Sequence, residues 1–191
     1  VEQGHEVHIA YQTSGNIAVS DDEALKFAEI SRSLDGNFEA SNKIISFLNT
    51  KTDKDKDSLE VRNLKGLIRQ SESLAATRYL NLDDKNVHFL NLPFYETGSI
   101  KKNTLSESDV QIMCDLIDEI KPHQIYAAGD LADPHGTHKV CLDALFEALK
   151  RLKTNSVERK NAGGMIGGRV KTGRRNYGYV NSNIGLGGLP I

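Results

Sequence analysis

Two histidines, three residues apart, are the side chains of this chain best suited to chemistry. His135 and His138 lie in the segment Asp133-Pro-His-Gly-Thr-His138, which follows the short apolar run Gln124–Ala128. Imidazole groups bind metals and transfer protons near neutral pH. Where a strand passes into a helix, both rings could point into one cleft. One histidine would then bind a metal, and the other would act on a proton or an oxyanion.

The pair alone is too small a set for a hydrolytic metal centre. Catalytic zinc uses three protein ligands, often with a carboxylate among them. Two aspartates are close in sequence: we expect Asp133 to cap the following helix and Asp130 to orient a histidine. A helix N-terminus that carries two imidazoles without a function is the alternative. The pattern by itself leaves both interpretations open.

Strands that alternate with amphipathic helices must position these residues. Apolar runs predict strands over 6–11, 86–90 and 124–128. Apolar positions at helical spacing, with Ser20 and Ser106 as caps, predict helices over 20–30, 40–48, 58–80, 106–120 and 137–152. This order predicts an α/β fold, a three-layer sandwich with a mostly parallel sheet.

In such a sheet, binding sites lie at the carboxyl ends of the strands. The segments 13–16, 92–98 and 130–138 each follow a predicted strand, so the histidine pair falls at the functional edge. Arg69 and Glu72 lie one turn apart on the long helix, and their spacing predicts an intrahelical ion pair. We interpret the other four histidines as structural residues without partners in register: His5, His8, His88 and His123.

Seven apolar positions are predicted to form the inner face of the long helix over 58–80. They are Val61, Leu64, Leu67, Ile68, Leu74, Ala75 and Leu80. Burial of this face would fix the outward direction of Arg69.

The composition is that of an ordinary soluble protein. The 191 residues are 38% hydrophobic and 26% charged, and no apolar run approaches the roughly 18 residues of a membrane span. We find no signal peptide and expect a cytoplasmic location. Cys114 and Cys141 lie in helical apolar patterns, which favours buried, reduced thiols over a disulfide.

The charge distribution predicts a boundary near residue 153. Residues 155–191 hold six of the basic side chains, one acidic side chain and nine of the sixteen glycines, whereas the preceding part is acidic. We therefore predict an α/β domain over 1–153 and a basic, Gly-rich tail over 154–191 that is disordered or non-native. Basic residues beside tyrosines could bind RNA, but the acidic body argues against a nucleic-acid partner.

Four segments occur in a characteristic order in this chain. They are Gly4-His-Glu-Val-His-Ile-Ala-Tyr-Gln-Thr-Ser-Gly15, Arg69-Gln-Ser-Glu72-Ser-Leu-Ala-Ala with Tyr79-Leu-Asn-Leu82, Val87-His-Phe-Leu-Asn-Leu-Pro93, and Asp133-Pro-His-Gly-Thr-His138. Together they resemble the PIG-L/LmbE family of zinc-dependent N-acetylglucosaminyl deacetylases. The sequence is most similar to the LmbE-like module of bacterial glucosamine-6-phosphate deaminase-type proteins.

The resemblance implies a Rossmann-like fold and assigns roles to three side chains. His138 is similar to the zinc ligand of the family's H-x-x-H motif. His135 is similar to its catalytic partner, which polarises the amide carbonyl or protonates the leaving amine. Arg69 is similar to the arginine that holds an amino-sugar substrate. In a complete site, zinc would activate water and a carboxylate would take its proton.

The chain also departs from the family pattern. The family's His-Pro-Asp-Asp segment, which supplies two zinc ligands and the general base, does not occur in this sequence. We expect it upstream of Val1, with a further strand. Phe94 stands where many members carry Asp, and Thr137 stands where many members carry Asp or Asn. We therefore expect weak or absent zinc binding and no activity from this chain alone. A non-catalytic module of a glucosamine-6-phosphate deaminase-type enzyme is the alternative; the oligomeric state is not predicted.

Overall fold

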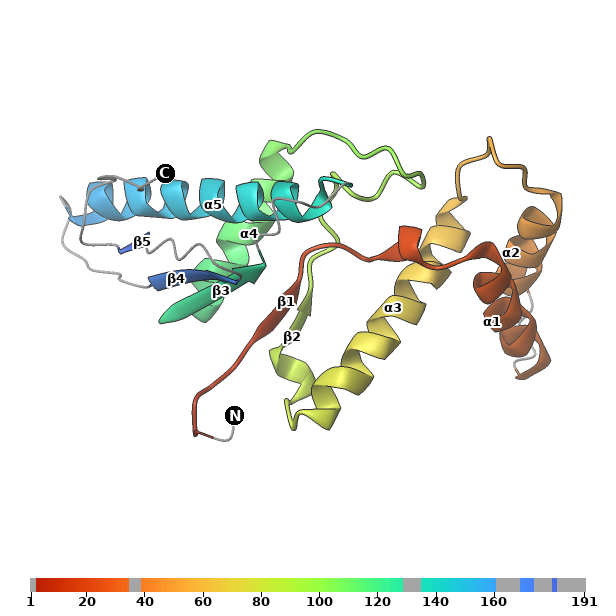
Figure 1. Cartoon of the computed structure of the whole chain (residues 1–191), viewed down its shortest axis with the longest axis horizontal. Coiled ribbons are helices and arrows are strands. Elements are labelled where there is room, and N and C mark those ends of the chain that lie inside the picture. Colours follow the sequence, from red (N-terminus) through yellow and green to blue (C-terminus); the bar gives the residue numbers. More distant parts are fainter. Residues whose placement is uncertain (1–2, 35–38, 129–134, 161–168, 174–179, 182–191) are drawn as a thin grey trace. The chain divides into compact units, whose positions relative to one another are not determined.

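The computed structural model describes residues 3–34, 39–128, 135–160, 169–173 and 180–181 (Figure 1). Its contacts divide the chain into two compact units, residues 1–104 and residues 105–191. The two units carry different candidate residues, since Arg69 lies in the first and His135 and His138 lie in the second.

The first unit is a pair of parallel strands with three α-helices between them in sequence. The strand β1 pairs with β2 through the partners Ile9↔Val87, Ala10↔His88 and Tyr11↔Phe89. The elements are β1 (Ile9–Tyr11), the 3-10 helix η1 (Asn16–Ala18), α1 (Asp21–Leu34), α2 (Glu39–Thr50), α3 (Leu59–Tyr79), the 3-10 helix η2 (Asp84–Asn86) and β2 (Val87–Phe89).

Side-chain caps fix where the helices of this unit begin. The backbone N–H of Glu23 donates to Ser20 Oγ at 3.1 Å, which places the start of α1 at the predicted cap. The backbone N–H of Val61 donates to Ser58 Oγ at 3.3 Å at the start of α3. Each cap satisfies a backbone donor that has no partner within its own helix.

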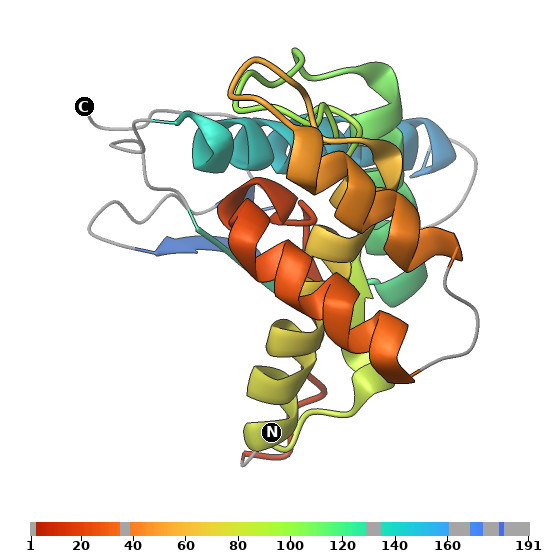
Figure 2. The same cartoon turned by 90° about the vertical axis from the view of Figure 1, so that its right-hand side faces the viewer.

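The apolar core of this unit lies where α1, α2 and α3 meet (Figure 2). Four residues are buried there and four more pack around them: Ala28, Ile44, Ile45 and Val61, then Leu25, Phe47, Leu48 and Leu64. The inner face predicted for α3 is wrong at Leu67 and Leu80, which are 60% and 61% exposed, and at Ala75, which is also exposed. The helix turns Val61, Lys65 and Ile68 inward, so Leu67 borders a cavity instead.

A closed ring of four charges joins the three helices. The Lys51 ammonium contacts Asp21 at 2.7 Å and also contacts Asp57. The Lys65 ammonium contacts Asp21 at 2.6 Å and Asp57 at 2.8 Å. The Lys65 side chain is 5% exposed and that of Asp57 is 10% exposed. Because a buried ammonium without partners costs several kcal/mol, this ring fixes the N-terminus of α1 against α3.

The second unit packs two helices against each other beside a small sheet. Strand β3 pairs parallel with β4, and β4 pairs antiparallel with β5. The elements are α4 (Glu107–Ile120), β3 (Gln124–Ala128), α5 (Thr137–Lys160), β4 (Arg169–Gly173) and β5 (Val180–Asn181). Six buried side chains of α4 and α5 form the apolar contact: Val110, Met113, Cys114, Leu142, Leu145 and Ala148.

The order of predicted strands and helices over 6–152 is confirmed, as is the α/β character with parallel pairing. The described strands form two small sheets, so a three-layer sandwich stays a prediction. Helix α5 continues to Lys160, eight residues beyond its predicted end. Most of the predicted tail lies outside the described residues, and the boundary at 153 stays a prediction.

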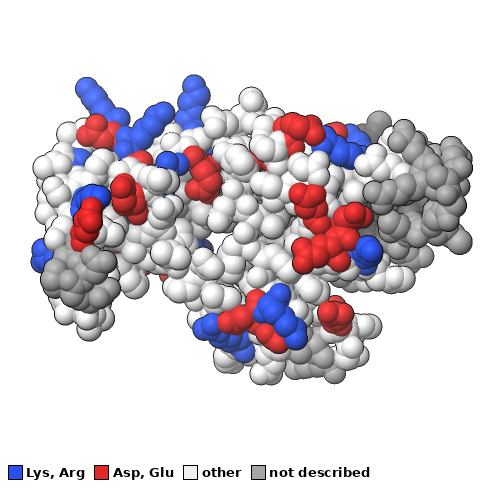
Figure 3. Space-filling model, turned by 180° about the vertical axis from the view of Figure 1, so that it is seen from behind, with Lys and Arg blue, Asp and Glu red and all other residues white. Residues whose placement is uncertain are grey.

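Cys114 and Cys141 form no disulfide with each other; Cys114 is buried, as predicted, whereas Cys141 is only partly buried. Burial raises the pKa of the Cys114 thiol. On the face of the molecule shown in Figure 3, acidic and basic side chains lie close together in small groups. Several ion pairs of the described residues join side chains that are close in sequence, as Lys43 does with Glu39 and Arg78 with Asp84. The described helices contain no segment with the length and apolar character that a membrane crossing requires.

Substitution Lys65→Met should destabilise the protein by about 3 kcal/mol, because it leaves two carboxylates with one cation in a buried site. Substitution Lys43→Met is the matched control. It removes an exposed partner of Glu39 and should cost less than about 0.5 kcal/mol. Urea unfolding of both variants measures the two values. Equal losses would contradict a structural role for the ring.

The ring also predicts a pH dependence. Burial of the Asp21 carboxyl opposes its ionisation, but hydrogen bonds from Lys51 and Lys65 outweigh burial and lower its pKa. A lowered folded-state pKa gives stability that is present above the ordinary Asp value and is lost as the pH falls through the folded value. Asp21→Asn should therefore flatten the loss of stability below about pH 4. Urea unfolding at a series of pH values measures the profile, and an unchanged slope in Asp21→Asn would contradict this role of the carboxylate.

Candidate functional site

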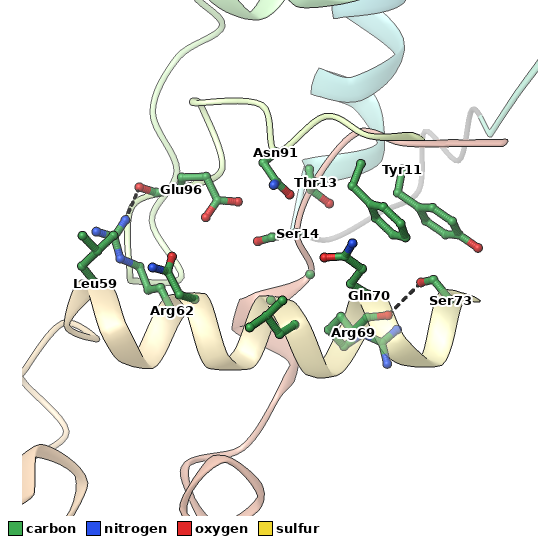
Figure 4. Close-up of a pocket in the computed structure, with 15 residues that line it drawn as sticks. Tyr11, Thr13, Ser14, Leu59, Arg62, Arg69, Gln70, Ser73, Asn91 and Glu96 are labelled. Carbon is green, nitrogen blue, oxygen red and sulfur yellow. Dashed lines mark hydrogen bonds between the residues drawn. The ribbon is translucent and has the colours of Figure 1, made fainter. Parts of the chain in front are cut away.

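A cavity of about 630 Å³ lies in the first unit, at the carboxyl ends of β1 and β2 and against α3 (Figure 4). The strands and their following loops provide one wall, and α3 provides the other. The lining residues are Tyr11, Thr13, Ser14, Gly15, Phe89, Asn91 and Glu96 from the first wall, and Leu59, Arg62, Asn63, Gly66, Leu67, Arg69, Gln70 and Ser73 from α3.

Backbone hydrogen bonds hold the two segments that leave the strands side by side. The N–H of Leu90 donates to Tyr11 O, and the N–H of Leu92 donates to Gln12 O, both at 2.9 Å. Gly15 turns the chain toward η1 with a φ of +68°. The prediction that segments 13–16 and 92–98 meet at one edge is thus confirmed. The third predicted segment, 130–138, belongs to the second unit.

Two polar side chains anchor the loop after β2 to the rest of the wall. The amide of Asn16, which is 1% exposed, donates to Glu96 Oε2 at 2.9 Å. Arg62 Nη1 donates to the backbone oxygen of Glu96 at 2.6 Å. Among the described residues, Glu96 Oε1 and Arg62 Nε are buried without a hydrogen-bond partner. Sequence reasoning did not find these residues, because only the fold brings Asn16 and Glu96 together.

The lining combines an aromatic surface with many hydrogen-bonding groups. The rings of Tyr11 and Phe89 stack with centroids 5.3 Å apart and planes at 9°. In Figure 4, Gln70 projects from α3 toward the segment that carries Thr13 and Ser14. Rings beside amide and hydroxyl groups suit a small polar ligand that has one apolar face.

Arg69 lines the cavity and its side chain is 45% exposed. Its Nη1 is paired with Glu72, so the predicted intrahelical pair is confirmed. A Cβ placed on Gly15 would lie 3.3 Å from Arg69 Cγ, which shows how closely the turn approaches this side chain. The position in the cavity wall is compatible with ligand contact, and the substrate role of Arg69 stays a prediction.

The histidine pair lies at the start of α5, as the sequence predicted. His138 is in the first turn of the helix and His135 precedes it, with Gly136 between them at a φ of +67°. Both imidazoles are exposed. Asp130 and Asp133, the predicted orienting and capping residues, lie outside the described residues. The roles of His135 and His138 therefore stay predictions.

The described residues do not complete a hydrolytic metal centre. Within 3–34, 39–128 and 135–160, no group of three or more His, Cys, Asp or Glu side chains could hold a metal ion. His138 could provide one zinc ligand, whereas hydrolytic zinc uses three from the protein. The residues present thus do not by themselves fit the zinc that the resemblance implies, and no zinc-dependent step follows from them.

Two histidines that were predicted to have no partners do have one. His8 Nδ1 lies 2.9 Å from His88 Nε2, so that prediction is wrong for this pair. The parallel register places Ala10 opposite His88 and therefore brings His8 to the same face of the sheet. The pairing of β1 with β2 is a tertiary feature that local sequence patterns do not reveal.

Gly15→Ala should destabilise the protein by about 1–2 kcal/mol. A side chain strains a backbone with positive φ, and here it would also press on Arg69. Gly66→Ala, on the opposite wall, is the contrast: its Cβ would lie 3.5 Å from Ser14 Cβ, an ordinary contact, inside a helix that favours Ala. Thermal unfolding should show a loss for the first variant and no loss for the second. The reverse order would contradict the geometry of this wall.

Comparisons with known proteins agree with this architecture. The family PIG-L, described as GlcNAc-PI de-N-acetylase, matches residues 1–149. A glucosamine-6-phosphate deaminase-like protein of Bacteroides thetaiotaomicron is 51% identical over 158 residues, which are 78% of this chain and 24% of that protein. The chain thus spans about a quarter of the length of this relative. The comparison with solved structures found no match. The chain belongs to the PIG-L family of GlcNAc-PI de-N-acetylases.

Proposed function

We propose that the cavity binds an amino sugar and that this chain is part of a zinc-dependent N-deacetylase of amino sugars. The observation that carries the proposal is the cavity of about 630 Å³ beside β1 and β2, with Arg69 in its wall and an aromatic pair next to amide groups. Family membership supports the deacetylase class. The name of the Bacteroides relative supports an amino-sugar theme.

Each lining group has a task in this proposal. The guanidinium of Arg69 donates to sugar oxygens, while Gln70 and Asn91 hydrogen bond to hydroxyl groups. The ring face of Tyr11 contacts the C–H face of the sugar. The hydrogen bonds from Asn16 and Arg62 to Glu96 keep the loop after β2 in place, so that the cavity retains its shape when it is empty.

The metal chemistry belongs to the larger protein in this proposal. His138 would be one zinc ligand and His135 the group that acts on the amide carbonyl or the leaving amine. The sequence contains no His-Pro-Asp-Asp segment, so the remaining ligands and the general base would come from other residues. We therefore propose that the chain alone binds zinc weakly or not at all and does not hydrolyse amides.

A non-catalytic sugar-binding module is the second candidate, and the packing of Phe94 favours it. Phe94 is 1% exposed and meets the Tyr95 ring edge-on with centroids 6.2 Å apart. It stands where many family members carry Asp, so an apolar core contact replaces a carboxylate. Thr137, at the start of α5, also stands where many members carry Asp or Asn. The full-length protein distinguishes the two: deacetylation that His138→Ala abolishes would rule out the second candidate.

We also propose that the chain has a Rossmann-like, three-layer α/β fold with a mostly parallel sheet, on the basis of its two parallel strand pairs, β1 with β2 and β3 with β4. Each pair has helices in the connection between its strands, as a doubly wound sheet requires.

Substitution Arg69→Gln should weaken the binding of N-acetylglucosamine or glucosamine 6-phosphate at least tenfold, because it removes a charged donor from the cavity wall. Arg78→Gln is the matched control, since Arg78 lies on the same helix and pairs with Asp84 outside the cavity. Saturation-transfer NMR with calorimetry measures both variants. If neither sugar binds the folded wild type, or if Arg78→Gln causes the same loss, the proposal fails.

A further inference from the structure

The histidines His8 and His88 face each other on the side of the β1–β2 sheet opposite the cavity. Successive side chains of a strand point to opposite faces. Tyr11 and Phe89 line the cavity, so His8, Ala10 and His88 share the other face. Ala10 is exposed there, and the His8 side chain is 22% exposed. A small ion from solvent can therefore reach this face of the unit.

The spacing of the two nitrogens matches that of neighbouring ligands on one metal ion. His8 Nδ1 lies 2.9 Å from His88 Nε2. Two imidazole nitrogens that each lie about 2.0–2.1 Å from a metal, at a right angle, are about 3 Å apart. The ring centroids are 5.2 Å apart and the planes meet at 17°, so the two nitrogen edges already point at each other. A turn of the rings about their Cβ–Cγ bonds would aim both lone pairs at one ion.

A carboxylate sets the tautomer of His8 in the way that metal ligands require. Glu6 Oε1 lies 3.3 Å from His8 Nε2 and accepts a hydrogen bond from it. This contact keeps a proton on Nε2 and leaves the Nδ1 lone pair directed at His88. A histidine that binds a metal through one nitrogen commonly donates its other N–H to a carboxylate, which also makes the ligating nitrogen more basic.

We propose that His8 Nδ1 and His88 Nε2 bind one divalent transition-metal ion, Cu²⁺ or Ni²⁺, with Glu6 as the positioning residue for His8. The proton that His88 Nε2 shares with His8 moves to His88 Nδ1 when the ion binds, so both ligands are neutral imidazoles. Water fills the other coordination positions. With two protein ligands the affinity for the ion is modest, and Cu²⁺ binds more tightly than Ni²⁺.

This site uses neither His135 nor His138, and it is independent of the proposed amino-sugar function. It also uses no residue of the cavity wall. Loss of the metal would thus leave sugar binding unchanged, and loss of sugar binding in Arg69→Gln would leave metal binding unchanged. The two proposals can fail separately.

The test is titration of the full chain with Ni²⁺ by calorimetry and with Cu²⁺ by electron paramagnetic resonance. The wild type should bind one ion, and the Cu²⁺ spectrum should show coupling to two imidazole nitrogens. His8→Gln and His88→Gln should each weaken binding at least tenfold and remove one nitrogen coupling. Glu6→Gln should weaken binding up to about tenfold and keep both couplings, because it alters only the orientation of His8.

Two controls separate this site from the other histidines. The exposed His123→Gln and the double variant His135→Gln/His138→Gln should bind both metals as the wild type does. Circular dichroism verifies that each variant is folded. Because His8 lies before β1 begins, His8→Gln still tests the site if His88→Gln does not fold. Unchanged binding in His8→Gln, or loss of the ion in the double variant, would overturn the proposal.

Discussion

The buried ammonium of Lys65 is the constraint on which the first unit depends. Its contacts with Asp21 and Asp57 require the start of α1 and the loop before α3 to stay where they are. The same loop reaches the cavity, because the N–H of Asp57 donates to Gly98 O at 3.0 Å, in the loop after β2. A charge that is costly to leave unpaired thus couples the helical core to the wall of the candidate site.

Polar contacts join the segments that form the cavity wall. Glu96 receives the amide of Asn16 at its carboxylate and the guanidinium of Arg62 at its backbone oxygen. Helix α3 therefore contributes Lys65 to the ion ring and contributes Arg62 and Arg69 to the cavity wall. Because these anchors involve charged groups, the wall is held in place before a ligand arrives, and a sugar need not order it.

Local signals in the sequence were sufficient to predict the helices and strands, but they did not predict the contacts between them. Caps such as Ser20 and Ser106 and the apolar run 124–128 predicted the helices and strands, because these depend on neighbours in sequence. Leu67 was predicted to be buried, but whether a side chain borders a cavity depends on the opposite wall. The contact of His8 with His88 and that of Asn16 with Glu96 each join residues 80 positions apart, and periodicity contains no information about them.

Mapping of a bound amino sugar onto the backbone amide signals of this chain tests the central claim most directly. With glucosamine 6-phosphate or N-acetylglucosamine as the titrant, the account predicts that the largest NMR shift changes fall at Ser14, Gln70 and Asn91, which line the cavity from three segments. A second groove of the first unit is lined by α2 together with Ser58 and Glu60, and its Asn42 and Ser46 signals should stay unchanged. Shift changes confined to that groove, or none at saturating sugar, would contradict the assignment of the cavity as the sugar site.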